Sequence, residues 1–202
     1  MNLSVLIPTV VGREAQFETL FLSLQSQINE YGLSQQVEIV AASDNKEISI
    51  GKKRDCLYKM ATGKFSVQID DDDSICSDYL YLINNVIKDN EVDCIGYYEL
   101  CTMDGNKFLS VISKEVKEWE TYPNVPIGKL KYRRTPFFKV PILTELCKQI
   151  GVNDMRFGED HDFAKRIHPL LKKEFFIYKE MYFYSSNSLT KKEHDKRYGI
   201  TK

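Results

Sequence analysis

Short apolar runs alternate with segments of helical spacing through the first half of this chain. Residues 3–7, 37–42 and 65–69 are apolar runs bounded by turn residues, which is typical of buried strands. Between them, apolar residues recur every three or four positions in 17–28 and 56–61. A strand–helix–strand order of this kind builds a largely parallel sheet with helices on both faces. We therefore expect an α/β fold.

The second half of the chain is less regular. Two strand-like runs, 94–100 and 107–112, flank an Asp-Gly pair at 104–105, which predicts a hairpin turn. Residues 113–140 contain three prolines and a run of basic side chains, and we expect them to be mostly loop. The run 175–184 is typical of a final strand.

Capping residues predict where the helices begin and end. Ser77 has the residue type of a helix N-cap, and Gly63 and Gly151 each follow a helical pattern as a C-terminal stop. Pro141 suits the first turn of the helix that Gly151 ends. A further helix is expected to begin near Gly158.

Length and composition are those of an ordinary globular protein. The chain has 202 residues, 43% of them hydrophobic, and a formal net charge of -1, so we expect one domain over 1–202 and no general affinity for polyanions. The N-terminus lacks the basic start and long apolar stretch of a secretory signal, and no run approaches the roughly 18 apolar residues of a membrane span. Five scattered cysteines without a CxxC pair indicate reduced thiols. We expect a cytoplasmic protein without stable membrane insertion.

Four consecutive aspartates, Asp70 to Asp73, follow the third apolar run. Packing four carboxylates together costs repulsion that neither a core nor a helix requires, unless a cation or a metal–diphosphate complex relieves it. Hard divalent cations such as Mg²⁺ and Mn²⁺ take oxygen ligands, often one or two carboxylates plus substrate phosphates. The alternative for the same run is a solvated acidic turn.

Polar residues also follow the first two apolar runs, with Pro8 and Thr9 after one and Ser43 and Asp44 after the other. In open α/β sheets, ligands bind where the carboxyl ends of the strands open into a crevice. If the strands are neighbours, these residues and the aspartate run line one cleft.

A second acidic group, Glu159-Asp160-His161-Asp162, lies at an expected helix start. The positive end of the helix dipole favours acidic residues there whether or not they have a function. A carboxylate held in a cleft beside a substrate is also suited to be a general base. Two acidic sites, one for a metal and one for proton removal, fit a metal-assisted group transfer.

Five segments of the chain, in order, resemble motifs of the family 2 glycosyltransferases of the GT-A fold. They are the opening strand at 4–9, the second strand at 38–44, the Lys53-Arg54-Asp55 helix with its ending at 61–65, the acidic run at 69–73 in the place of the DxD motif, and 158–163 in the place of the Gly-Glu-Asp acceptor-site motif. Their order and spacing make the resemblance specific.

The resemblance implies a GT-A (nucleotide-diphospho-sugar transferase) fold, a mostly parallel Rossmann-like sheet flanked by helices. Residues 1–100 then form the nucleotide-sugar-binding half and 101–202 the acceptor-binding half. It implies an inverting glycosyltransferase that depends on Mn²⁺ or Mg²⁺ and moves a sugar from a nucleotide-diphosphate donor, UDP-sugar by default, to a hydroxyl. A glycan is the expected acceptor, with a lipid-linked sugar, a protein or a modified nucleic acid left open.

The resemblance also implies roles for site residues. Asp160 is the expected general base, Glu159 orients the acceptor or the donor sugar, Asp72 is the metal ligand, and Asp73 caps the turn. The expected donor-binding residues are Pro8, Thr9, Asp44, Arg54, Asp70 and Asp71.

One departure from the family pattern concerns the metal. Ser185 stands where many relatives have a histidine near the metal or diphosphate, which leaves that place to water, His194 or nothing. This departure favours one alternative, a nucleotide-sugar-binding protein with weak or no catalysis. A nucleotidyltransferase is the other, but it normally has a glycine-rich phosphate loop after the first strand, and 10–14 contains one glycine.

Several other residues have both a binding and a structural interpretation. Trp119 and Tyr122 form either a stacking surface for a sugar or ordinary packing under a loop. His161 either touches substrate or is an exposed helix residue, and His168 is expected to be structural. The basic run either binds an anionic acceptor or the diphosphate, or is a solvated loop; its members are Lys129, Lys131, Arg133 and Arg134.

Overall fold

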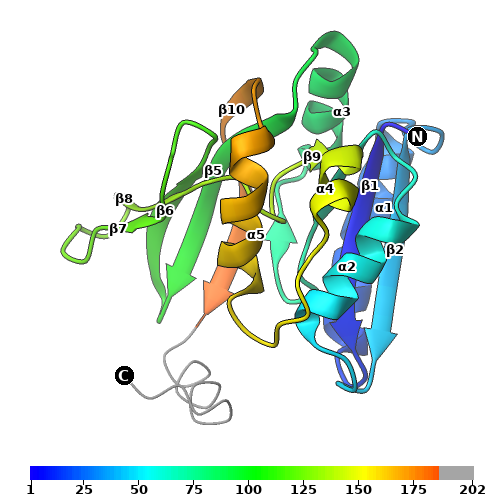
Figure 1. Cartoon of the computed structure of the whole chain (residues 1–202), viewed down its shortest axis with the longest axis horizontal. Coiled ribbons are helices and arrows are strands. Elements are labelled where there is room, and N and C mark those ends of the chain that lie inside the picture. The colour runs from blue at the N-terminus through cyan, green and yellow to red at the C-terminus, as the bar shows by residue number, and fades with distance from the viewer. Residues whose placement is uncertain (187–202) are drawn as a thin grey trace.

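The computed structural model describes residues 1–186 of the chain, which form a ten-stranded sheet flanked by helices (Figure 1). The expected α/β fold class is confirmed. In chain order the elements are β1 (Leu3–Val10), α1 (Glu14–Glu30), β2 (Val37–Asp44), α2 (Ile50–Met60), β3 (Phe65–Gln68), β4 (Ser74–Ile75), α3 (Tyr79–Asp89), β5 (Cys94–Met103), β6 (Asn106–Ile112), β7 (Glu120–Thr121), β8 (Leu130–Arg134), β9 (Ile142–Leu143), α4 (Thr144–Ile150), α5 (Glu159–Ile167), a 3-10 turn (His168–Leu170) and β10 (Glu174–Ser186).

The N-terminal strands are parallel, as their apolar runs predict. β1 lies between β2 and β3 and is parallel to both, so all three end at the same edge of the sheet. The strand order is β2-β1-β3-β9-β5-β6-β8-β7, and β10 pairs with β5 in parallel and with β4. The short β9 is antiparallel to β3 and to β5, and thereby joins the parallel half to a mixed half.

Helices cover both faces of the sheet. α2, α4 and α5 lie in series on the face toward the viewer, and α1 packs against α3 on the other (Figure 1). The ring of Phe163 on α5 lies 5.6 Å from Tyr58 of α2 and 4.7 Å from Phe138. All three rings are almost fully buried. This aromatic contact fixes α2 and α5, which carry site residues, relative to one another.

The hairpin predicted from the Asp-Gly pair is confirmed. Asp104 (φ 48°) and Gly105 (φ 80°) both have positive φ between β5 and β6, as two-residue hairpin turns require. The loop expected over 113–140 is wrong in part, because β7 and β8 pair within it and β8 adds in parallel to the edge of β6. The basic side chains of β8 hide its strand character because they break the apolar pattern.

Two of the predicted caps are wrong. The residue at the N-cap of α3 is Asp78 rather than Ser77. The C-cap of α2 is Ala61 rather than Gly63, and Gly63 has another reason to be glycine. A Cβ at Gly63 would lie 2.6 Å from the backbone nitrogen of Ser4, so this glycine lets the chain pass close to β1.

The helix expected to begin at Pro141 begins later. Ile142 and Leu143 form β9, since sheet pairing with β3 and β5 is available to them, and α4 starts at Thr144. Gly151 ends this helix with φ 58°, as predicted, and α5 begins directly after Gly158. No helix within residues 1–186 combines the length and apolar character needed to cross a membrane. The five cysteines are free, as expected.

Candidate active site

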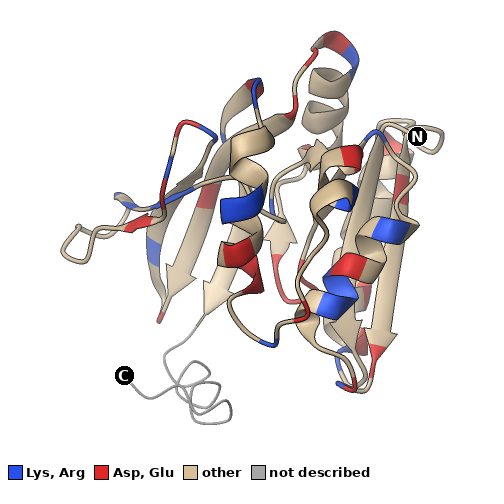
Figure 2. Cartoon of the chain, in the orientation of Figure 1, with Lys and Arg blue, Asp and Glu red and all other residues tan. Residues whose placement is uncertain are grey.

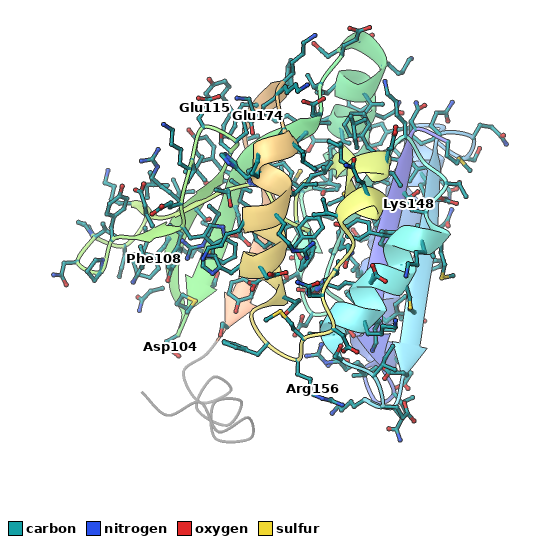
Figure 3. The ribbon with its side chains drawn as sticks, viewed as in Figure 1. Asp104, Phe108, Glu115, Lys148, Arg156 and Glu174 are labelled. Carbon is teal, nitrogen blue, oxygen red and sulfur yellow. The ribbon has the colours of Figure 1, made fainter. Side chains whose placement is uncertain are left out.

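A cavity of about 800 Å³ opens where the carboxyl ends of β1 and β2 face the second half of the sheet. Its walls come from the loop after β1, the end of β2, α2, β5, β6, β8, the segment 137–139 and the start of α5. Figure 3 shows Arg156, another lining residue, on the loop that leads into α5, and its guanidinium donates to the backbone oxygen of Glu47 after β2. The cavity therefore lies at the strand ends, where the sequence predicts a cleft.

Five of the predicted site residues line this cavity, namely Asp44, Arg54, Asp70, Glu159 and Asp160. The other four do not. The predicted residues outside the lining are Pro8, Thr9, Asp71 and Asp72.

Arg54 connects the two acidic motifs. Its guanidinium lies 2.9 Å from Asp70 and 3.3 Å from Glu159, and it also donates to Gln68. Burial by itself lowers the pKa of Arg54, but the carboxylates of Asp70 and Glu159 raise it well above the ordinary value. Arg54 thus holds two segments that are 89 positions apart, counted from Asp70 to Glu159, against the same side of the cavity.

Asp70 and Glu159 both pair with Arg54, but their pKa values shift in opposite directions. Burial raises the pKa of Asp70, but the positive charges of Arg54 and Lys139 lower it by more than burial raises it. The pKa therefore lies below the ordinary value. The pKa of Glu159 lies above its ordinary value because burial outweighs the pull of Arg54. The first turn of α5, which carries Glu159 and Asp160, is acidic and its last turn basic (Figure 2), which suits the helix dipole.

Lys53 is a site residue to which the sequence interpretation gave no role. Its buried ammonium forms an ion pair with Asp44 and donates to the backbone oxygen of Thr9, tying the end of β2 to the end of β1. Burial raises the pKa of Asp44, but the hydrogen bond from Lys53 lowers it, and the net shift is downward.

Arg13, at the start of α1, pairs with the middle of the aspartate run and was also missed. Its guanidinium lies 2.5 Å from Asp71 and 2.7 Å from Asp72. The second oxygen of Asp71 accepts from the hydroxyl of Thr9 at 2.6 Å. Thr9 and Asp71 therefore hold one another beneath the cavity lining.

Asp73 does more than cap a turn, which corrects the prediction for this residue. Its side chain is buried, accepts a hydrogen bond from the Tyr182 hydroxyl at 2.6 Å and lies 3.1 Å from the Lys139 ammonium. Lys139 also contacts Glu99 at 3.0 Å and lies between the rings of Tyr182 and Tyr184. Lys139 thus ties the aspartate run to β5 and β10 in the second half.

The environment of Asp73 predicts a pH-dependent stability. Burial raises the pKa of Asp73 to about 7, against the pull of Lys139. Because the folded state binds this proton more tightly than the unfolded state, its contribution to the free energy of unfolding is lost as pH rises from about 4 to about 7. We expect Asp73→Asn to flatten this dependence by about 3 kcal/mol, measured by urea unfolding at pH 4.5 and 7.5. An unchanged slope in the variant contradicts the assignment.

Each of the four aspartates is paired with a cation of the protein itself, so the repulsion within the run is partly relieved by Arg13, Arg54 and Lys139. Within residues 1–186 no group of three or more His, Cys, Asp or Glu side chains is placed to hold a metal. Asp72 nevertheless fits one, because its side chain is 49% exposed and hard cations often take one protein carboxylate and complete their shell from phosphates and water.

The family pattern also places a residue near the metal on the C-terminal side of the chain. Ser185, the residue in the place of the family histidine, lies in β10 opposite Thr102 of β5. His194, the other candidate for that place, lies outside the described residues.

The lining also contains an aromatic and basic group of side chains. Trp119 donates from its indole to the hydroxyl of Thr135 and lies 5.1 Å from the ring of His161. Arg134 is the member of the basic run that lines the cavity, together with Tyr132 from the same strand. The remaining candidates do not line it, namely Tyr122, Lys129, Lys131, Arg133, His161 and His168. His168 bonds to the backbone of Lys114 as a structural residue.

Comparison with known proteins gives structural neighbours only. No family model and no curated sequence matches the chain. Residues 1–349 of S. aureus TarS superpose with a TM-score of 0.62 at 17% identity, over 92% of this chain and 60% of that one. GalNAc-T7, in a complex with UDP, GalNAc and Mn²⁺, gives 0.56 at 12% identity, over 92% and 44%. The catalytic domain of Drosophila β1,4-galactosyltransferase 7 gives 0.51 at 12%, over 90% and 68%.

The chain thus spans about 60% of the length of the TarS 1–349 chain it matches. The neighbours are glycosyltransferases of the GT-A type, and the sequence identities of 12–17% support likeness of fold. The described part of the chain has the GT-A fold that the sequence predicts.

Proposed function

We propose that the protein is an inverting, cation-dependent glycosyltransferase that uses a nucleotide-diphosphate sugar. The observation that carries the proposal is the Asp70–Arg54–Glu159 bridge, which brings the DxD-like run and the start of α5 to one cavity. A donor that enters at the strand ends would then have a carboxylate-bearing helix beside its sugar. The GT-A fold of the chain is consistent with this arrangement.

The charge of the cavity suits an anionic donor. Among the described lining residues, seven are basic and five acidic. The basic ones are Arg13, Lys46, Lys53, Arg54, Arg134, Lys139 and Arg156, and the acidic ones are Asp44, Asp70, Glu99, Glu159 and Asp160. We assign recognition of the nucleoside to Asp44 and contact with the ribose or diphosphate to Arg54 and Asp70. A uridine nucleotide is the first choice because S. aureus TarS has been crystallised with UDP-GlcNAc and with UDP.

We assign the general base to Asp160 rather than Glu159. Glu159 is buried and bound to Arg54, whereas Asp160 is half-buried, lines the cavity and has no ion pair among the described residues. In the proposed reaction Asp160 takes the proton of the acceptor hydroxyl while the oxygen of that hydroxyl bonds to the anomeric carbon. The bond between that carbon and the diphosphate breaks on the opposite face, and the configuration inverts.

A divalent cation, Mn²⁺ or Mg²⁺, would be held by Asp72 together with the donor diphosphate. When bound, it stabilises the charge that develops on the leaving diphosphate. Arg13 shares the Asp72 carboxylate in this structure, so a cation on Asp72 would compete with Arg13 for that carboxylate.

Release of nucleotide diphosphate from a panel of nucleotide sugars, with Mn²⁺ and a mixture of acceptors, tests the proposal. Metal-dependent release that requires an acceptor supports a glycosyltransferase. Formation of pyrophosphate would instead indicate a nucleotidyltransferase, and donor binding without release across the whole panel would indicate a binding protein.

Asp72→Asn tests the cation site directly. We expect the Mn²⁺ concentration for half-maximal release to rise about 10- to 100-fold, because removing one charged ligand weakens a site that has few protein ligands. Mn²⁺-dependent donor binding, followed by electron paramagnetic resonance, checks the same site without turnover. Asp89→Asn, at an exposed position at the end of α3, is the matched control. Equal Mn²⁺ dependence in the two variants contradicts the role of Asp72.

A further inference from the structure

Arg134 has a fixed orientation on the cavity wall. Its guanidinium lies over the ring of Trp119 and over that of Tyr132, 4.8 Å from the centre of each. One of its terminal nitrogens donates to the backbone oxygens of Glu120 at 2.6 Å and Arg133 at 3.1 Å, and the other donates to the hydroxyl of Thr121 at 3.4 Å, which leaves one N–H of that nitrogen and the Nε–H free among the described residues. These contacts restrain the side chain, so a ligand that bound it would lose little rotamer entropy of the protein.

No acidic side chain neutralises Arg134 among the described residues. Arg54, another arginine of the lining, has ion pairs to Asp70 and Glu159, whereas no ion pair to Arg134 is present within residues 1–186. The nearby carboxylates of Glu99 and Asp160 do not outweigh burial, which lowers the pKa of Arg134. A partly buried guanidinium without a counter-ion favours an anionic ligand.

Ser110 adds a second polar group to the same wall. In the sheet register Glu99 lies opposite Ser110, and Ser110 opposite Tyr132, so the three side chains form one row across β5, β6 and β8. Ser110 is 1% exposed and lines the cavity, yet its hydroxyl has no hydrogen-bond partner among the described residues. A buried hydroxyl without a partner is costly. The hydroxyl is closed to water in this structure, so a ligand oxygen would satisfy it after a small local movement of the side chains around it.

We propose that Arg134 and Ser110 form an anion-binding subsite for the acceptor, so that the reacting hydroxyl belongs to a molecule with a phosphate or carboxylate group beside the reacting unit. The inference rests on the proposed function, since it names the acceptor of that reaction. The oxygen atoms of either anion would accept from the free N–H groups of Arg134 and from the hydroxyl of Ser110.

The subsite belongs to the acceptor rather than to the donor because of where it lies. Arg13, Lys53 and Arg54 provide positive charge at the ends of β1 to β3, whereas Arg134 is on β8. Its stacking partner Trp119 contacts His161, the residue after the assigned base Asp160. An anion at Arg134 would therefore be bound next to the helix turn that carries the base.

Trp119, the single tryptophan of the chain, makes the subsite measurable by fluorescence. With UDP present at saturation, the protein is titrated with glucose 6-phosphate, methyl glucuronide and the neutral methyl glucoside. We expect one or both of the anionic compounds to change the Trp119 emission and methyl glucoside not to, with the stronger response identifying phosphate or carboxylate. No response to either anion, or an equal response to methyl glucoside, overturns the proposal.

Variants test whether Arg134 and Ser110 are responsible. We expect Arg134→Gln to weaken anion binding about 10- to 100-fold and Arg134→Lys to restore part of it, while the control Arg133→Gln has little effect because Arg133 does not line the cavity. Ser110→Ala should weaken binding with no loss of thermal stability, because its hydroxyl has no partner to lose. Unchanged anion binding in both Arg134→Gln and Ser110→Ala overturns the proposal.

Failure of this inference can be told from failure of the proposed function. If nucleotide sugars are turned over but anionic and neutral acceptors react equally in the wild type and in Arg134→Gln, the subsite is wrong and the function stands. If Arg134→Gln weakens UDP binding as much as anion binding, Arg134 contacts the donor and the acceptor subsite is wrong. The fluorescence titration is read without turnover, so it decides the subsite even if no nucleotide sugar is consumed.

Discussion

Asp160→Asn is expected to reduce the rate of sugar transfer about 10²- to 10⁴-fold, the range in which general-base catalysis contributes. Asparagine keeps the size and position of the side chain at the start of α5 but cannot take the acceptor proton. Donor binding should be retained, because Asp160 has no ion pair with the residues assigned to the donor within the described chain. Initial rates of nucleotide-diphosphate release at saturating donor, with donor affinity measured by titration, check both parts.

Asp162→Asn is the matched control for this experiment. Asp162 lies on the same turn, but its carboxylate is bound to Arg166 and it does not line the cavity. We expect its transfer rate to stay within a few-fold of the wild type. Transfer by Asp160→Asn at a comparable rate would show that another group removes the proton, and Glu159, whose pKa is raised by burial, would be the next candidate.

The sequence predicts those parts of the fold that depend on local pattern. The runs at 3–7, 37–42 and 65–69 are β1, β2 and β3, because a strand buried on both faces is apolar along its length. The Asp-Gly turn was predictable because its positive φ angles require such residues. By contrast β8 and β9 were missed, since neither has an apolar pattern of its own. β9 exists through pairing with strands distant in sequence, and β8, with its basic side chains, through pairing with β6 and β7.

The residues of the candidate site also fall into those that the sequence predicts and those that it does not. The acidic residues stand out in the sequence because adjacent carboxylates are unusual, and the resemblance to a known family assigns a role to each of them. The cations that pair with them do not stand out, because an isolated Arg13, Lys53 or Lys139 looks like any surface residue. Arg13 is 58 positions from Asp71, and only the folded sheet brings them together. A signal was present for Lys53, which is next to Arg54 in a recognised segment.

These cations change what the aspartate run means. Its repulsion suggested a bound metal, yet Arg13, Arg54 and Lys139 already supply compensating charge in the protein alone. A divalent cation would therefore compete with Arg13 for Asp72 rather than enter a vacant acidic site. The run is better understood as the centre of an ion-pair network that joins α1, α2, β5 and β10 below the cavity.

Removing Arg54 should therefore cause the largest loss of stability among the site residues. Arg54→Leu leaves Glu159 buried and Asp70 partly buried without their shared counter-ion, and we expect the free energy of unfolding to fall by about 3–5 kcal/mol. Without Arg54 the pKa of both carboxyl groups should rise, so the loss should be greater at pH 8, where they must ionise, than at pH 5. Urea unfolding at the two pH values measures both effects.

Arg133→Leu provides the comparison, because it removes an arginine from a half-exposed ion pair with Glu120, and water screens such a pair so that it contributes little to stability. Arg54→Lys separates charge from geometry. Lysine keeps the charge but cannot reach Asp70, Glu159 and Gln68 at once, so it should recover part of the stability and little of the donor affinity. Suppose that Arg54→Leu lost no more stability than Arg133→Leu, and lost it equally at both pH values. Arg54 could then not be the residue that holds the aspartate run and α5 together, and another contact would have to join the two acidic sides of the cavity.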